Sequence, residues 1–380
     1  MSVQLPLSAP GHTVSEGSPI RVLLVDDSAV VRNLMAQVLA TDPSIVVAGS
    51  AANGQLAVQL FRTSNIDVVV MDLEMPVMDG MTAIPKLLEV DRNAKIIIAS
   101  TLTLRNAEIS LKAMELGAVD YISKPTTPRD IGVEGDFRRD LLTKIKSHGG
   151  LRRSLPKSNT ARTYSVTERA PAVHAAPKIV LRQPGLFRPK ILAIGSSTGG
   201  PQALFAFLKD LPKTLGLPTV ITQHMPATFT AVLAQHIQRM CGWPCQEGFE
   251  GAVLTPGTIY VAPGGHHMLI EGSAAKMTVR LSQTPPENFC RPSVDPMMRS
   301  LVNVLGGHVL AVMLTGMGSD GLAGFGQVVQ AGGTVIAQDA ETSVVWGMPG
   351  AVATAGLCAA VLPLPRLAPY VVQLIEKTKS

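Results

Sequence analysis

The chain has 380 residues, more than a single core usually holds and enough for two domains. Hydrophobic residues make up 46% of it and charged residues 16%, which excludes a largely disordered protein. Its apolar runs have the length of strands and fall far short of the roughly 20 residues that a membrane span needs, so we predict no membrane insertion.

The first residues and the cysteines indicate a protein that is not secreted. Residues 1–19 lack the basic start and apolar core of a secretory signal, and we interpret them as a flexible tail. The four cysteines are too few for a disulfide framework and suit a reducing compartment, which favours the cytoplasm. Cys241 and Cys245 have C-x3-C spacing, but no second ligand pair follows nearby, which disfavours a metal site there.

The formal net charge of +5 is not spread evenly along the chain. From Arg138 to Lys190 there are thirteen Lys and Arg against two acidic residues, so the rest of the chain is net acidic. A nucleic-acid-binding domain carries its basic residues on a folded surface, and we therefore predict no nucleic-acid partner. Residues 143–188 show no sustained apolar period, and we interpret them as a basic linker, with attraction to an acidic partner as the alternative.

Between residues 20 and 142, apolar β-branched segments alternate with amphipathic segments such as Ala29–Leu39 and Ala107–Glu115. The predicted strands are Ile20–Val25, Val46–Gly49, Asp67–Met71, Lys95–Ala99 and Asp120–Ile122. Five strands separated by helical segments predict an α/β domain with a five-stranded, doubly wound parallel sheet of the flavodoxin-like kind.

Carboxylates follow two of these strands. Asp26 and Asp27 come after the first strand, and Asp72 comes after the third. Ligands of an open parallel sheet bind at the carboxyl ends of its strands, so we expect the three side chains to converge. Because such a cluster repels itself without a cation and offers only oxygen ligands, the sequence predicts a Mg²⁺ site formed by these residues.

Two later strands add a hydroxyl donor and a cation at the same edge. The hydroxyl is that of Ser100 or its neighbour Thr101, and the cation is Lys124. Together with the acidic cluster they suit the oxygens of a transferred phosphoryl group, which predicts a phosphoryl-transfer site.

The segments VLLVDDS, VVVMDLEMPVMDG and YISKP closely resemble the strand ends of the response-regulator receiver family, over residues 20–142. The resemblance implies a receiver that is phosphorylated by a histidine kinase with the help of Mg²⁺. It implies these roles by position: Asp72 as phosphoacceptor, Ser100 and Lys124 as contacts of the phosphoryl oxygens, and Asp26, Asp27 and Asp72 as metal ligands.

A second series of strand-like and helix-like segments occupies residues 189–377. The predicted strands are Lys190–Ile194, Thr219–Thr222, Thr258–Ala262, Met277–Leu281, Val309–Leu314 and Thr334–Ala337. The pattern predicts a second α/β domain, again with a doubly wound parallel sheet.

The first strand of this series runs into a glycine-rich turn, GSSTGGP, on which hydroxyls are exposed as a nucleophile requires. A nucleotide-binding turn is the alternative, but the segment has neither G-x-G-x-x-G nor a Walker lysine. The best-placed base is His224, directly after the next strand, with His266, His267 and His308 as competitors. Asp320 lies in the turn after the strand Val309–Leu314 and can orient an imidazole.

Six ordered segments resemble the chemotaxis protein-glutamate methylesterase family: IGSSTGGPQAL, TQHMP, YVAPGGHHM, RPSVDPMM, LTGMGSDG and AQDAETSVVWGMPGAV. The resemblance implies a hydrolase with Ser197 as nucleophile, His224 as base and Asp320 as orienting acid. It also implies oxyanion support by Thr198 and the backbone of Met317. Cys290 stands where the family pattern leads us to expect histidine, and we interpret the nearby His267 and Arg291 as structural or substrate-contacting.

The resemblance further implies a function and partners. The enzyme would remove methyl groups from glutamate methyl esters of methyl-accepting chemotaxis receptors, release methanol, and deamidate particular receptor glutamines. The phosphodonor would be a chemotaxis histidine kinase, the esterase chemistry would need no cofactor, and the receiver would inhibit by covering the active site until it is phosphorylated. A receiver joined to a binding module, either a transcriptional output or a nucleotide sensor, is the competing hypothesis.

Overall fold

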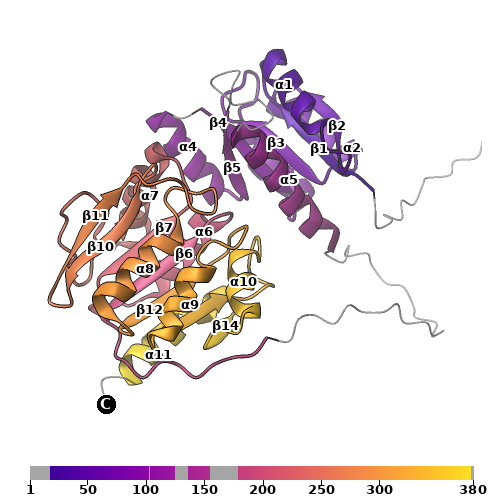
Figure 1. Cartoon of the computed structure of the whole chain (residues 1–380). Coiled ribbons are helices and arrows are strands. Elements are labelled where there is room, and N and C mark those ends of the chain that lie inside the picture. Colours follow the sequence, from indigo (N-terminus) through magenta and orange to yellow (C-terminus); the bar gives the residue numbers. More distant parts are fainter. Residues whose placement is uncertain (1–17, 102, 125–135, 155–178, 378–380) are drawn as a thin grey trace, which may run out of the picture.

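The structure, a computed structural model, describes residues 18–101, 103–124, 136–154 and 179–377 (Figure 1). These residues form two α/β units, one for each predicted series of strands. Most of the predicted N-terminal tail lies outside the described residues. In the described parts of the chain, no helix is long and apolar enough to cross a membrane.

The first unit is a five-stranded parallel sheet with strand order β2-β1-β3-β4-β5, which confirms the predicted fold. Its strands are β1 (Ile20–Val25), β2 (Ile45–Ala51), β3 (Val68–Asp72), β4 (Lys95–Ser100) and β5 (Asp120–Ser123). Its helices are α1 (Ala29–Leu39), α2 (Gly54–Thr63), α3 (Gly80–Val90), α4 (Leu104–Glu115) and α5 (Asp136–Ser154). Polar side chains accept hydrogen bonds at the starts of four helices and fix where those helices begin: Ser28, Asn53, Asp79 and Thr103.

The last helix differs from the prediction, because α5 continues twelve residues past the expected end of the domain at 142, to Ser154. Ile145 and His148 on this helix are fully buried against the sheet. Lys144, which counted toward the charge of the predicted linker, forms ion pairs with Asp120 at 3.2 Å and Asp140 at 3.3 Å. The charge of Lys144 is therefore balanced by ion pairs within the first unit. Residues 143–154 are part of helix α5 and are not a linker.

The second unit contains a seven-stranded parallel sheet with strand order β14-β13-β12-β6-β7-β9-β8. Its strands are β6 (Ile191–Ser196), β7 (Thr219–Gln223), β8 (Cys245–Glu247), β9 (Ile259–Val261), β12 (Val309–Met313), β13 (Thr334–Gln338) and β14 (Ala360–Leu362). The parallel-sheet fold is confirmed. The segment predicted as strand Met277–Leu281 belongs instead to a separate antiparallel hairpin, formed by β10 (His267–Ser273) and β11 (Lys276–Ser282).

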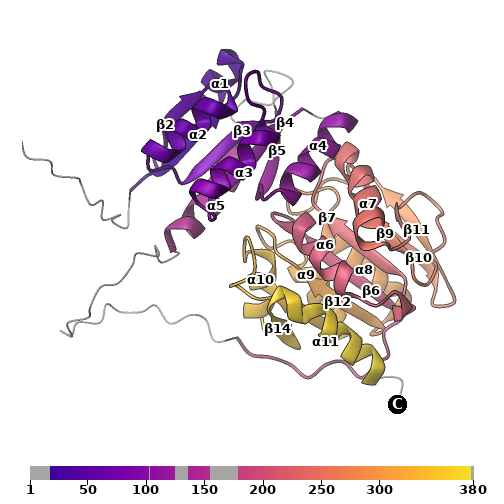
Figure 2. The same cartoon turned by 180° about the vertical axis from the view of Figure 1, so that it is seen from behind.

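Helices cover both faces of this sheet. They are α6 (Gly200–Asp210), α7 (Ala227–Cys241), α8 (Val294–Leu305), α9 (Leu322–Gln330), α10 (Met348–Thr354) and α11 (Leu364–Lys377). Figure 1 shows α8 and α9 in front of the sheet, and Figure 2 shows α6 and α11 on the opposite face. All six residues of β6 are buried, because Leu192 and Ile194 pack toward one layer and Ile191 and Ala193 toward the other.

The chain reaches the second unit along its outer surface. Residues 179–188, which the sequence analysis placed in the linker, lie against this unit: the Arg182 amide donates to the Cys358 carbonyl at 2.9 Å. His308 Nδ1 contacts the Arg188 carbonyl at 2.8 Å, directly before β6 begins. His308 therefore lies at the amino end of the sheet, away from the strand ends where chemistry collects.

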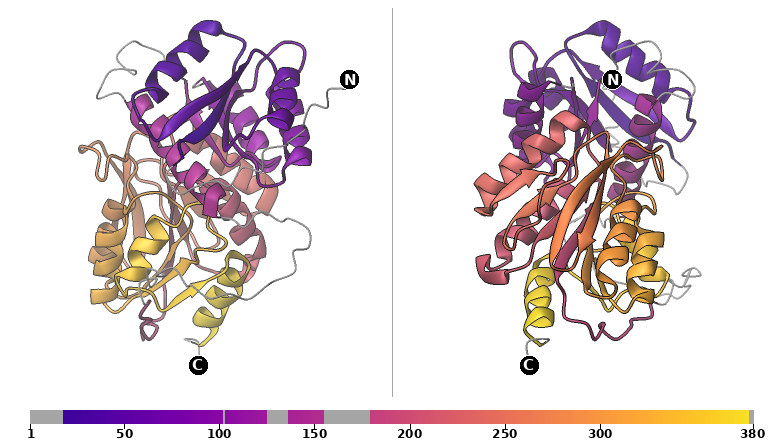
Figure 3. Two further views of the ribbon diagram at one scale, coloured as in Figure 1. Left: turned by 90° about the vertical axis from the view of Figure 1, so that its right-hand side faces the viewer. Right: turned by 60° about the vertical axis from the view of Figure 1, so that its left-hand side comes forward.

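The two units meet at the carboxyl end of the second sheet, with the first unit above it in both views of Figure 3. The rings of Tyr121 on β5 and Phe229 on α7 stack with centroids 4.5 Å apart and 12° between their planes. Beside them, Gln202 Nε2 donates to the Ala118 carbonyl at 2.7 Å. One apolar cluster therefore runs from the first core into the second.

Candidate active site and phosphoacceptor site

The turn after β6 presents one of its two serines to solvent. Ser196 is fully buried, and its Oγ donates to Gln223 Oε1 at 2.7 Å. Ser197 is partly exposed and lines a cavity. The turn needs glycine at Gly199, where φ is +72° and a Cβ would lie 2.5 Å from Val344. Only Ser197 is therefore accessible for attack on a substrate.

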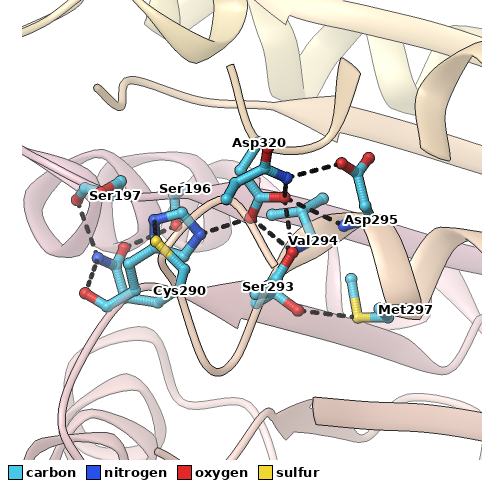
Figure 4. A network of polar contacts seen from close by, with 12 residues as sticks. Ser196, Ser197, Cys290, Ser293, Val294, Asp295, Met297 and Asp320 are labelled. Atoms are coloured by element: carbon cyan, nitrogen blue, oxygen red, sulfur yellow. Dashed lines mark hydrogen bonds and ion pairs between the residues drawn. The ribbon is translucent and has the colours of Figure 1, made fainter. Parts of the chain in front are cut away.

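Asp320 is held rigidly beside His224, which follows β7. The Asp320 Oδ2 atom lies 2.7 Å from His224 Nε2 and accepts the Val294 amide at 2.7 Å. Its Oδ1 atom accepts from Ser293 Oγ at 2.7 Å and from Asn288 Nδ2 at 2.9 Å (Figure 4). Burial tends to raise the pKa of Asp320, but His224 and these donors lower it to about 2. Asp320 is therefore a carboxylate that fixes one ring nitrogen.

The other nitrogen of His224 contacts sulfur. His224 Nδ1 lies 3.4 Å from Cys290 Sγ. Burial lowers the pKa of His224, whereas the Cys290 sulfur and the Asp320 carboxylate raise it, with a net result of about 10. Among the contacts of the described residues there is no hydrogen bond between Ser197 and His224, although both line the same cavity. The structure thus brings the predicted base and acid into contact and leaves the predicted nucleophile near them.

Backbone amides beside Ser197 provide candidate oxyanion donors. The Ser197 amide itself donates to the Thr315 carbonyl at 3.0 Å and is not available. Thr315 Oγ1 donates to the Thr198 carbonyl at 3.0 Å and fixes that residue. Within the described chain, the backbone N–H groups of Thr198 and Met317 have no hydrogen-bond acceptor, and both residues line the cavity. The geometry is compatible with the predicted role of Thr198 and Met317 in oxyanion support.

Both units enclose this cavity, which has a volume of about 640 Å³. Its walls include Tyr121, Lys124 and Lys144 from the first unit, and Ser197, His224 and Met317 from the second. Contacts from α5 close it: Ser147 Oγ lies 3.0 Å from Met317 Sδ, and the Arg139 guanidinium lies 5.0 Å from the centroid of the Phe289 ring. The first unit therefore lies over the candidate esterase site.

The phosphoryl-transfer residues also come together. Lys124 Nζ lies 2.7 Å from Asp26 Oδ2 and 2.8 Å from Asp72 Oδ2. Burial raises the pKa of Asp72, and the ion pair with Lys124 counteracts this. Ser100 is buried at the end of β4, and Thr101 Oγ1 accepts from Asn106 Nδ2 at 2.6 Å. Ser100 Oγ also has a partner, the Thr101 carbonyl at 3.4 Å, so these contacts do not decide between the two hydroxyls.

The acidic cluster fits a hard divalent cation. One carboxylate oxygen from each of Asp26, Asp27 and Asp72 lies within 4.8 Å of the others. Asp26 and Asp72 are buried and Asp27 is exposed, so the cluster is open to solvent on one side. A few carboxylate ligands and room for several waters are the features that Mg²⁺ prefers.

The sequence analysis missed one part of the site, the turn that carries Cys290. Asn288 and Phe289 have φ values of +51° and +62°, and Asn288 Nδ2 donates to both Asp320 Oδ1 and Asp295 Oδ2 at 2.9 Å. The contact with Asp320 spans 32 positions and the turn depends on an unusual backbone, so no local motif indicates this arrangement. His267 is fully buried and bonded to the Ser293 amide at 3.2 Å, as expected for a structural residue.

Comparison with known proteins gives two family matches. Residues 22–133 match the response regulator receiver domain, and residues 192–371 match the CheB methylesterase family. The solved CheB methylesterase catalytic domain of Thermotoga maritima is 38% identical, with a TM-score of 0.48, over 49% of this chain and 98% of that chain.

Similar curated proteins extend over nearly the whole chain. A protein-glutamate methylesterase/protein-glutamine glutaminase of Paramagnetospirillum magneticum is 51% identical, over 94% of this chain and 97% of the relative. One of Azospirillum brasilense is 50% identical, over 96% of each chain. These matches confirm both resemblances seen in the sequence. The chain carries a receiver fold and a methylesterase fold, and its relatives are about half identical over nearly its whole length. It therefore belongs to the protein-glutamate methylesterase/protein-glutamine glutaminase family.

Proposed function

We propose that this chain is a phosphorylation-controlled enzyme that hydrolyses glutamate methyl esters on chemotaxis receptors, releases methanol, and deamidates particular receptor glutamines. The observation that carries the proposal is the pairing of His224 with a buried, ionised Asp320 beside the partly exposed Ser197. The family membership supplies the substrate class.

The chemistry follows from the roles of these groups. Asp320 holds the proton on His224 Nε2, which leaves Nδ1 as the base. His224 takes the proton of Ser197 Oγ as the oxygen attacks the ester carbonyl, and Thr198 and Met317 amides stabilise the oxyanion. The carbonyl–methoxy bond breaks, and methanol leaves with the proton from His224. Water then attacks the acyl-enzyme by the same route, freeing glutamate and Ser197. With a glutamine substrate, ammonia leaves in place of methanol.

For the receiver, we propose phosphorylation of Asp72 by a chemotaxis histidine kinase. Asp26, Asp27 and Asp72 would hold Mg²⁺, and Lys124 and Ser100 would contact the phosphoryl oxygens. Bound Mg²⁺ would neutralise charge on the transferred group. The esterase chemistry needs only side chains and backbone amides. We also propose a cytoplasmic location, which suits four cysteines that are all free thiols.

The direct test is methanol release from methylated receptor membranes, measured with and without acetyl phosphate as phosphodonor. The full-length protein should release methanol, and acetyl phosphate should increase the rate. Absence of methanol in both conditions would refute the proposed esterase function.

Control by coverage predicts that weakening the contact between the units raises activity without phosphorylation. Gln202→Glu replaces the donor to the Ala118 carbonyl with a carboxylate, which repels that oxygen. Leaving a buried polar group unpaired costs about 1–3 kcal/mol, enough to shift the closed population several-fold or more. Methanol release without acetyl phosphate should therefore rise about 5-fold or more.

Gln37→Glu is a matched control, because Gln37 is exposed on α1 and lies outside the contact between the units. It changes charge by the same amount and should leave unstimulated methanol release unaltered. Equal rates for Gln202→Glu and the wild type would contradict control by coverage.

The phosphoacceptor assignment predicts a selective loss of stimulation. Asp72→Asn removes the nucleophilic carboxylate but keeps the size of the side chain, so acetyl phosphate should no longer increase methanol release. Asp79→Asn is the control, since Asp79 caps α3 through its hydrogen bond to the Thr82 amide and asparagine caps equally well. If acetyl phosphate still increases methanol release by Asp72→Asn, the phosphoacceptor is a residue other than Asp72.

A further inference from the structure

The turn that carries Cys290 is built onto the acid of the active site. The Glu287 and Cys290 backbones exchange two hydrogen bonds, at 2.9 and 3.1 Å, and Asn288 ties the turn to Asp320. Phe289 has φ of +62°, a conformation that a bulky side chain adopts only when its surroundings enforce it. The backbone bonds with Glu287 and the bond between Asn288 and Asp320 therefore fix the position of Cys290 relative to His224.

The Cys290 thiol contacts the one ring atom that the reaction needs. Asp320 engages His224 Nε2 at 2.7 Å, so Ser197 must deliver its proton to Nδ1. Cys290 Sγ lies 3.4 Å from that nitrogen, within hydrogen-bond reach for sulfur, as the dashed line at the labelled sulfur in Figure 4 shows. A proton held between Nδ1 and the sulfur therefore occupies the lone pair that Ser197 needs.

Cys290 is not placed to act as the nucleophile. The Ser197 amide donates to the Thr315 carbonyl, and Ser197 lines the cavity together with Thr198 and Met317, which carry the candidate oxyanion donors. Cys290 approaches the imidazole from the loop before α8, and its backbone bonds are with Glu287. A thiol attacking from that loop would lack the oxyanion amides of the serine turn.

The other three cysteines provide a contrast. Cys241, Cys245 and Cys358 are buried, and burial raises the pKa of each thiol. Within the described chain, Cys290 is the one cysteine that is partly exposed and lines the cavity. Cys290 is therefore the thiol whose hydrogen-bond partner can change when solvent or substrate occupies the cavity.

We propose that Cys290 is a positioning residue whose sulfur holds a proton on Nδ1 of His224, so that the sulfur must turn away and Nδ1 must lose that proton before Ser197 is activated. This inference rests on the proposed esterase function. It also accounts for the missing Ser197–His224 hydrogen bond in the covered arrangement. The thiol adds a local restraint on the base to the coverage by the receiver.

Several charged groups share the cavity with the ring and bear on its titration. Asp320 contacts Nε2 and Cys290 contacts Nδ1 directly. The more distant charges are Arg291 on the same loop, Asp120 at the start of β5 and Lys124 just after its end, and Arg139, Asp140 and Lys144 on α5. Removing the thiol changes only the contact at Nδ1, so a change in titration reports on that contact.

The test compares wild type, Cys290→Ala and Cys290→Ser as full-length proteins, with methanol release from methylated receptor membranes measured over pH in the presence of acetyl phosphate. Cys290→Ala should raise kcat/KM about 2- to 10-fold near neutral pH, the worth of one hydrogen bond. The acid limb of its pH profile, where kcat/KM falls as His224 becomes protonated, should move to lower pH. The reason is that the sulfur raises the pKa of His224 in the wild type. Cys290→Ser keeps a hydrogen-bond partner for Nδ1 and should lie between the other two. A loss of activity in Cys290→Ala, or an acid limb that does not move, would overturn the inference.

A second measurement needs no substrate. The pKa of His224 is read by NMR titration of its ring, assigned by comparison with His224→Gln, and should fall in Cys290→Ala. If the wild type releases no methanol but the pKa of His224 is lower in Cys290→Ala, the proposed esterase function is wrong and the contact between Cys290 and His224 is supported. If methanol release is normal and the pKa is unchanged, the inference about Cys290 fails alone.

Discussion

Ser197→Ala should lower methanol release from methylated receptor membranes by about 10⁴- to 10⁶-fold, because it removes the attacking oxygen and leaves only binding and oxyanion stabilisation. The structure gives this serine the exposed position on the turn after β6, next to the Thr198 amide. The measurement is the initial rate of methanol release with acetyl phosphate present, with thermal unfolding to verify that the variant folds.

Ser196→Ala is the matched control for this prediction. The Ser196 hydroxyl is buried and donates to Gln223 Oε1, whose amide group in turn donates to the Ser197 carbonyl at 2.9 Å. Losing it loosens the turn, and we expect the rate to remain within about tenfold of wild type. A loss in Ser196→Ala as large as that in Ser197→Ala would show that the nucleophile is misassigned.

Asp320→Asn should lower the rate by about 10³- to 10⁴-fold while leaving the backbone in place. The carboxylate accepts hydrogen bonds on both oxygens, from His224 and Val294 on one and from Ser293 on the other. An amide has one donating end, which favours the proton on Nδ1 and so disables the nitrogen that serves Ser197. The rate of methanol release between pH 6 and pH 9 measures the loss.

Asp295→Asn is a nearby control with a similar environment. Asp295 is buried and accepts the Gly324 amide at 2.6 Å, but its carboxylate does not contact His224 among the described interactions. Burial raises the pKa of Asp295, so a neutral side chain is tolerated better there than at position 320. We expect less than a tenfold loss. Equal losses for the two variants would mean that Asp320 acts only in packing.

Much of the fold is predictable because its strands are buried on both faces. The strand β6 shows the reason: every residue is covered, so the sequence is a continuous apolar run. The strands β8 and β14, with three residues each, and the hairpin strand β10 were not predicted, whereas β9, equally short, was predicted because it lies within an apolar run. The hairpin strand β11 was assigned to the parallel sheet because alternation indicates a strand but not its partner.

The helix α5 shows a different limit. Its lysines have the composition of a linker, yet Lys144 is half-buried between Asp120 and Asp140, and Lys146 pairs with Asp42. Ion pairs between distant segments are not visible in local composition. The boundary between domain and linker therefore lies in tertiary contacts that the sequence analysis could not supply.

The candidate sites divide in the same way. Asp26, Asp72 and Lys124 were predictable as neighbours because parallel strands bring their carboxyl ends to one edge. The choice between Ser196 and Ser197 was not, since both stand on one turn and the residue that distinguishes them is Gln223, 27 positions away. The contact of Cys290 with His224 spans 66 positions and has no sequence signature.

The position of the receiver over the Ser197 cavity has a thermodynamic consequence. Under the proposed control by coverage, the receiver and the substrate protein would use the same face and so compete for the second unit. Linkage is reciprocal: under the proposed function, the factor by which a phosphoryl group on Asp72 strengthens substrate binding is also the factor by which bound substrate shifts the phosphorylation equilibrium toward the phosphorylated form. The proposed function therefore implies that an enzyme bound to its substrate protein is phosphorylated to a greater extent at equilibrium than the free enzyme.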